Sequence, residues 1–246
     1  MSKVSVAALL LTGVLALSTD QAGAQAVADQ LATCKNEGVA AEARIAACGR
    51  AIQDATDDEI RGEALIQRGV LHEQSANREA AIKDYSEAIK LDPASAVAFF
   101  NRGNAYDQLG DYDRAIADYS EAIKLDPKEA DYYNNRGQAY DHKGQHDLAI
   151  ADYTAASRLD ARSARPLYNR GLSYANKGDY QRAITDFDQA IRLSPDDADL
   201  YVARGAAHEE LGNESAAKAD YIKALEVDPD SEDAREGVNR LGGVMR

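Results

Sequence analysis

The feature that most constrains this chain is an internal period of 34 residues. An Arg-Gly pair, an Asp-aromatic pair and a terminating segment close to Leu-Asp-Pro all return five times with this step. The Arg-Gly pairs are Arg68-Gly69, Arg102-Gly103, Arg136-Gly137, Arg170-Gly171 and Arg204-Gly205. Since three markers keep register over five copies, the chain is an array of repeats that bury their apolar faces against their neighbours.

Each copy predicts two helices. In the second copy, residues 96–109 contain no helix breaker except Gly103, and Gly110 then marks a helix C-terminus. Residues 113–125 carry apolar side chains with the i, i+3, i+4, i+7 spacing of a one-faced helix, which Pro127 terminates. Glycine is unfavourable in the middle of a helix, so its return at Gly103 and its equivalents indicates that two helices approach too closely there for a side chain.

These residues resemble the tetratricopeptide repeat family. Counted from Gly62, each copy has the family's glycine at its eighth position, alanine at the twentieth and an aromatic residue four positions later. The copies depart from the family pattern in having arginine, not leucine, at position seven. The resemblance implies an all-α fold, a right-handed α-α superhelix of antiparallel helix pairs, with repeats at 62–95, 96–129, 130–163, 164–197 and 198–231.

The first 24 residues differ from the rest of the chain. A lysine is followed by an apolar stretch, and Ala22-Gly23-Ala24 offers the small residues that signal peptidase recognises. We therefore expect residues 1–24 to be a signal peptide, with export across the inner membrane to the periplasm and no membrane insertion after cleavage. The alternative is an uncleaved anchor, although the apolar core is short for one.

Residues 25–61 resemble a degenerate helical pair that precedes the five full repeats. It contains both cysteines of the chain, Cys34 and Cys48, and in an exported protein two cysteines this close together predict one disulfide. In a reducing compartment they would instead be buried thiols. Residues 232–246 predict a polar helix that caps the last repeat.

In the family, the first helix of each pair lines a concave groove in which peptides bind, and this implies a set of partner-binding residues. Asn101, Asn135 and Asn169 share one repeat position and form an expected ladder of amides, which can bond the backbone of an extended peptide. The alternative is that asparagine is a tolerated polar residue copied with the repeat. The full candidate set is Gln67, Phe100, Asn101, Asn104, Asp131, Asn134, Asn135, Gln138, Tyr168 and Asn169.

The chain is acidic, with a formal net charge of −14, so nucleic acid is not an expected partner. Acidic side chains are predicted to face the groove, which favours a neutral or cationic segment of another protein or peptide. The alternative is that these acids only keep the protein soluble. The acids are Glu63, Glu73, Asp107, Asp131, Asp141, Asp199, Glu209 and Glu210, opposed by Arg165.

The sequence predicts no catalytic site, no metal site and no cofactor. His72 and His208 replace a tyrosine of the repeat and are interpreted as packing residues, and Gly144 interrupts the spacing of His142 and His146. No phosphate-binding loop or nucleophile motif is present. We therefore predict a non-catalytic scaffold or adaptor that binds an extended peptide segment in the groove. The alternative is a structural subunit or assembly factor of a cell-envelope complex that uses its convex or end surfaces.

Overall fold

The computed structural model describes the placement of residues 7–242, and within this range the only regular elements are thirteen helices. Most of the predicted signal peptide, residues 1–24, lies outside the residues whose side chains are described, so export stays a prediction. In the described part of the chain, no helix combines the length and the apolarity that crossing a membrane requires.

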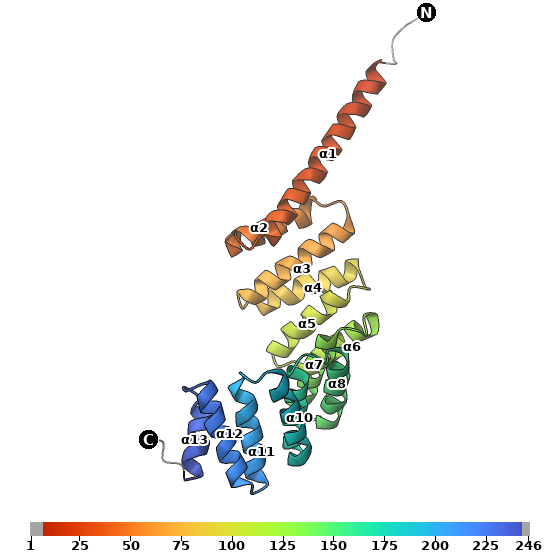
Figure 1. Cartoon of the computed structure of the whole chain (residues 1–246). Helices are drawn as coiled ribbons and strands as arrows, with labels where there is room; N and C mark the ends of the chain where they lie inside the picture. Colours follow the sequence, from red (N-terminus) through yellow and green to blue (C-terminus); the bar gives the residue numbers. More distant parts are fainter. Residues whose placement is uncertain (1–6, 243–246) are drawn as a thin grey trace, which may run out of the picture. The chain divides into compact units, whose positions relative to one another are not determined.

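The chain divides into two compact units, residues 1–110 and 111–246. In the first unit, successive helices pack side by side as antiparallel hairpins (Figure 1). Its helices are α1 (Ala7–Lys35), α2 (Ala41–Asp54), α3 (Asp58–Gln74), α4 (Arg78–Leu91) and α5 (Ala96–Gln108).

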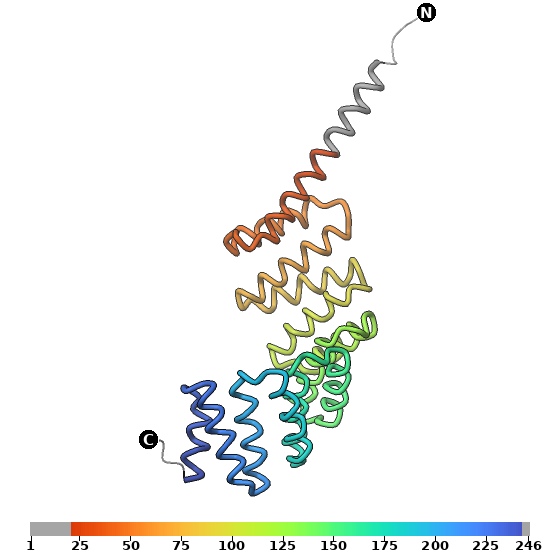
Figure 2. Tube along the Cα trace, in the orientation of Figure 1, coloured from red at the N-terminus to blue at the C-terminus, as the bar shows by residue number. Residues whose placement is uncertain are grey.

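The second unit continues the hairpin pattern and ends with one extra helix, which packs beside the last repeat (Figure 2). Its helices are α6 (Tyr112–Leu125), α7 (Ala130–His142), α8 (His146–Leu159), α9 (Arg165–Asn176), α10 (Tyr180–Leu193), α11 (Ala198–Glu210), α12 (Glu214–Val227) and α13 (Glu232–Arg240). We call α3, α5, α7, α9 and α11 the first helices of the repeats, and α4, α6, α8, α10 and α12 the second helices.

The mid-helix glycines have the steric role expected from the sequence. A Cβ atom on Gly171 would lie 2.5 Å from the ring of Phe187, and one on Gly69 would lie 2.5 Å from the ring of Tyr85. Both rings are fully buried, at 0% exposure. The glycine of the first helix therefore makes room for the core aromatic residue of the second helix, which fixes how closely the two helices pack.

The turn inside each hairpin requires a left-handed residue. Gly144, Gly178 and Gly212 have φ angles of 70°, 75° and 73°, which glycine adopts without strain. The first full repeat instead has Ala76 at this point, with a φ of 57°. This alanine is a strained position in an otherwise regular array.

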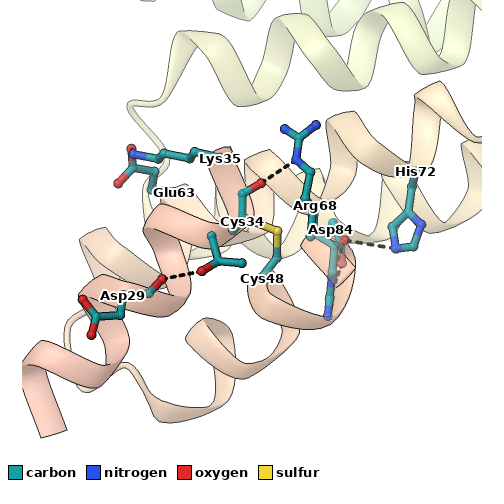
Figure 3. The surroundings of a disulfide bond; sticks show 10 residues. Asp29, Cys34, Lys35, Cys48, Glu63, Arg68, His72 and Asp84 are labelled. Atoms are coloured by element: carbon teal, nitrogen blue, oxygen red, sulfur yellow. Dashed lines mark hydrogen bonds and ion pairs between the residues drawn. A yellow bond between two sulfur atoms is a disulfide. The ribbon is translucent and has the colours of Figure 1, made fainter. Parts of the chain in front are cut away.

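The N-terminal pair is joined covalently. Cys34 at the end of α1 and Cys48 in α2 form a disulfide with a Cα–Cα distance of 5.0 Å (Figure 3). Both sulfur-bearing side chains are fully buried and pack against Leu71 of α3. The side chain of Arg44 also donates to the carbonyl of Cys34 at 3.0 Å. The disulfide is therefore buried where the N-terminal helical pair packs against α3.

Candidate functional site

A buried arginine–aspartate pair holds the first helix to the second helix in the first, third, fourth and fifth repeats. In the fourth repeat, Arg170 donates to both carboxylate oxygens of Asp186 at 2.7 Å, and it also donates to the hydroxyl of Thr154 in the preceding repeat at 2.9 Å. Asp186 is only 3% exposed. The hydrogen bonds to the carboxylate raise the pKa of the Arg170 guanidinium.

We call this pairing of a first-helix arginine with a second-helix aspartate the arginine–aspartate joint, and it recurs in other repeats. Equivalent bidentate pairs are Arg68–Asp84, Arg136–Asp152 and Arg204–Asp220. The arginine also reaches the preceding second helix at Ser86 from Arg102, at Ser120 from Arg136 and at Asp188 from Arg204. The arginines that replace leucine at position seven are therefore structural, because they link each first helix to neighbouring second helices.

That surface carries a pocket in the first unit. The pocket has a volume of about 660 Å³ and lies among the start of α3, the end of α4 and the start of α5. Ile66 and Leu91 lie in its wall beside Val97, which is 51% exposed. Gln67, one of the predicted contact residues, also lines it. We call this hollow the first-unit pocket.

Four carboxylates line the first-unit pocket. Glu63 is paired with Lys35 of α1, and Asp58 is paired with Arg61 at 2.5 Å (Figure 3 shows the Lys35–Glu63 pair). Glu59 and Asp92 have no cationic partner among the described residues. The pocket therefore combines an apolar wall with uncompensated negative charge, a combination that suits a long cationic side chain.

Three further candidates of the first unit lie on α5. Phe100, Asn101 and Asn104 are all partly exposed there.

In the second unit, the predicted amides form one hydrogen-bonded network. The side-chain amide of Asn169 on α9 donates to Asn134 on α7 at 3.1 Å. Asn134 in turn donates to Asn135 at 3.3 Å and to Gln138 at 3.4 Å. The amides of two neighbouring first helices are therefore linked, and Gln138 is the exposed end of the network.

Asn134 does not contribute a contact surface as predicted. Its side chain is 0% exposed, so it cannot touch a partner, and its role is to hold Asn169. Tyr168 likewise packs between the repeats, against the cluster that contains Leu167 and Leu200, and burial raises its pKa. Asp131 is exposed but forms an ion pair with Arg165.

Most of the acids predicted to face the groove have hydrogen-bond or ion-pair partners within the fold. The acids at position twelve of the repeat accept hydrogen bonds from buried tyrosine hydroxyls. The pairs are Glu73 with Tyr85, Asp141 with Tyr153, and Glu209 with Tyr221. Sequence patterns could not reveal this, because the tyrosine lies twelve residues away on the other helix of the hairpin.

The environments of Glu73 and Glu209 differ although their repeat position is the same. Burial raises the pKa of Glu73, even though Tyr85 donates to it. Arg240 of α13 donates twice to Glu209, at 2.6 and 2.9 Å, and this lowers the pKa of Glu209. The last helix therefore gives Glu209 a direct hydrogen-bonded counter-charge, whereas Arg78 acts on Glu73 only through its electrostatic field.

The histidines are not assembled into a metal site. His146 contacts Asp141 at 2.8 Å, whereas His142 stacks on Tyr112 with ring centroids 4.8 Å apart. Within the described residues, no group of three or more possible metal ligands is present. His72 lies 3.8 Å from Asp84 beside the buried arginine pair.

Sequence reasoning missed two parts of the surface. The carboxylates at the mouth of the first-unit pocket come from the junction before the first full repeat, and the acid cluster at Asp57-Asp58-Glu59 was the available signal. The arginine–aspartate joints were signalled by two invariant positions 16 residues apart.

Comparison with known proteins identifies the family. Models described as tetratricopeptide repeat or TPR repeat match residues 77–110, 96–129, 119–151, 142–178, 171–212 and 198–231. The chain belongs to the tetratricopeptide repeat family, and its fold class is the predicted all-α repeat superhelix. Proteins of this family are in general non-catalytic scaffolds for interactions with other proteins. No curated protein sequence gave a significant match.

Solved structures of the same fold support this assignment. A tetratricopeptide repeat protein from Parabacteroides merdae has a TM-score of 0.74 and 17% identity, with 88% of this chain and 86% of that chain covered. MamA has a TM-score of 0.63 and 26% identity, with coverage of 65% and 94%. YrrB, described as a TPR protein with an unusual peptide-binding site, has a TM-score of 0.65 and 22% identity, with coverage of 78% and 97%.

Proposed function

We propose that this chain is an exported, non-catalytic adaptor that binds an extended segment of another protein along the surface of its first helices. The observation that carries this proposal is the first-unit pocket. Gln67, one of the residues expected to bind a partner, lines it together with Glu63 and Ile66 of the same helix.

The chemistry of the pocket favours a lysine or arginine side chain of the partner. Val97 and Ile66 can pack against the apolar stem of such a side chain. Glu59 and Asp92 can then meet its charged end. Elsewhere on the first helices, the amides of Asn101 in the first unit and of Gln138 in the second offer both donors and acceptors to a peptide backbone whatever its sequence.

The proposal can be tested by capture of the partner from an envelope extract. The bait is the chain from residue 25 onward, and the variant carries Glu59→Lys and Asp92→Lys. We expect the variant to recover at least tenfold less of the bound protein, because it places two cations in the pocket. A matched control carries Glu37→Lys and Glu236→Lys, which reverse two exposed carboxylates away from the pocket.

If the native chain, the pocket variant and the control variant recover equal amounts of the partner protein, binding at the pocket is refuted. A further bait with Asn101→Ala, Asn135→Ala and Asn169→Ala tests the amides. Circular dichroism establishes that each bait keeps its helix content. If the amide variant binds as well as the native chain, the asparagines are inherited with the repeat and do not hold the peptide backbone.

A further inference from the structure

A second pocket lies in the second unit, on the side of the second helices. It has a volume of about 400 Å³ and is formed by the C-terminal ends of α8 and α10 together with α9. Leu167, Leu193 and Ala161 give it apolar walls. Ala161 stands where the other repeats have proline, so the wall lacks the ring that Pro127 or Pro195 would bring.

The regular repeats show what normally occupies this part of a second helix. In the first repeat, Lys90 at position 29 pairs with Glu87 at 2.6 Å, one turn earlier. In the second repeat, Lys124 pairs with Glu121 at 3.0 Å in the same way. The cation at this position is therefore neutralised by its own helix.

Repeats three and four break this arrangement at both positions. The cation is arginine in both, at Arg158 and Arg192, and the acid one turn earlier is replaced by Ala155 and Gln189. Within the described residues, neither guanidinium has a carboxylate partner. Both arginines line the same pocket. In a chain of net charge −14, two unpaired guanidiniums in one pocket stand out from the surrounding acidic surface.

The other polar groups of the pocket wall are already engaged. Arg170 is held by Asp186 and by the hydroxyl of Thr154. The hydroxyls of Thr154 and Ser157 donate to backbone carbonyls of their own helix. The side-chain amide of Gln189 donates to the carbonyl of Thr185 at 3.4 Å. The side chains of Arg158 and Arg192 are therefore the unpaired cationic donors that this pocket can present to a ligand.

We propose that this pocket binds a carboxylate side chain from an acidic segment of a partner protein, gripped between Arg158 and Arg192. The planar guanidinium donates two parallel hydrogen bonds to a carboxylate, and the apolar walls accommodate the methylenes of a glutamate. A carboxylate carries one negative charge, whereas a phosphate monoester carries nearly two, so the acidic chain repels the carboxylate less. This site is separate from the first-unit pocket and does not rest on the function proposed for it.

The test uses a small probe of defined chemistry. The signals of the arginine Nε–Hε groups are followed by NMR while acetyl-Leu-Glu-Leu-amide, acetyl-Leu-Gln-Leu-amide or inorganic phosphate is added to the chain. We expect the glutamate peptide to shift the signals of Arg158 and Arg192 and to bind at least tenfold more tightly than the glutamine peptide. The variant with Arg158→Gln and Arg192→Gln should lose this difference.

A matched control separates local contacts from overall charge. Arg50→Gln with Lys83→Gln removes two exposed cations that also lack carboxylate partners, and it should bind the glutamate peptide as the native chain does. Equal binding of the two peptides, or no shift at concentrations on the order of 10 mM, would overturn the proposal. Tighter binding of phosphate than of the glutamate peptide would overturn the assignment to a carboxylate.

Discussion

Replacement of Arg170 by leucine tests whether the buried arginine–aspartate joint stabilises the array. Leucine is the family's usual residue at this position and fits a helix. The change removes three hydrogen bonds and leaves the carboxylate of Asp186, which is 3% exposed, without a counter-charge. Breaking a buried ion pair in this way costs about 3–5 kcal/mol of unfolding free energy. The loss comes mainly from the stranded charge and less from the lost contact.

A double-mutant cycle isolates the interaction free energy between Arg170 and Asp186. Urea unfolding, followed by circular dichroism, is measured for Arg170→Leu, for Asp186→Ala and for the double variant. We expect the double variant to be no less stable than Arg170→Leu alone, which gives a coupling energy of at least about 2 kcal/mol. Arg114→Leu is the control, because its ion pair with Asp111 is exposed to solvent and its loss should cost much less than the loss of the buried pair. Additive losses in the cycle would refute the argument that the stranded charge dominates.

Three further predictions concern local features of the fold. Ala76→Gly should stabilise the chain by about 1 kcal/mol in thermal unfolding, because it relieves a left-handed alanine with a φ of 57°. Reduction of the Cys34–Cys48 disulfide, which spans a sequence separation of 14, should lower stability by about 3 kcal/mol when melting is compared with and without reductant. Glu209→Gln should destabilise the chain at pH 7 by at most about 1 kcal/mol. That difference should shrink as the pH falls below the ordinary glutamate pKa of 4.5, because Arg240 holds the pKa of Glu209 below this value and the stabilisation is lost on protonation.

Each of these predictions has an internal control. Gly178→Ala should have the opposite sign to Ala76→Gly, since it creates the same strain in a turn with a φ of 75°. Reductant should not change the melting of a variant that carries Cys34→Ser and Cys48→Ser. Glu73→Gln should cause no loss at pH 7, because burial raises the pKa of Glu73 and its ionised form costs stability as the pH rises. A loss for Glu73→Gln equal to that for Glu209→Gln would contradict the role given to Arg240.

The helices and their hairpins could be predicted because the signals for them are local. A repeated glycine marks the turn in four of the five repeats, and the spacing of apolar residues marks each buried face. The need for Gly171 was also predictable, since a mid-helix glycine that returns with the period has a steric cause. The disulfide followed from the even number of cysteines and the expectation of export, and the structure contains it.

The contacts between helices could not be predicted from the repeat pattern. Asn134 was assigned to the surface because the fifth position of the repeat lies on the side of the first helix opposite the core stripe, yet its side chain is 0% exposed and Asn169 of α9 bonds to it. The acids of the first helices were counted as surface charge because the pattern did not show that tyrosine hydroxyls and Arg240 reach them. Burial of a polar side chain depends on which neighbour packs over it, and that is a property of the stacked array.

The arginine joint also bears on how an array of this kind can change its length. Each repeat brings its own arginine and aspartate, and the first four repeats also bring a side-chain oxygen that the next repeat's arginine uses, as Thr154 and Ser120 show. Duplication or deletion of one complete repeat therefore leaves every buried charge paired. A slip of a single helical turn would strand the same charges. The array can therefore gain or lose complete 34-residue repeats and keep these pairs. Insertion or deletion of part of a repeat would separate an arginine from its aspartate.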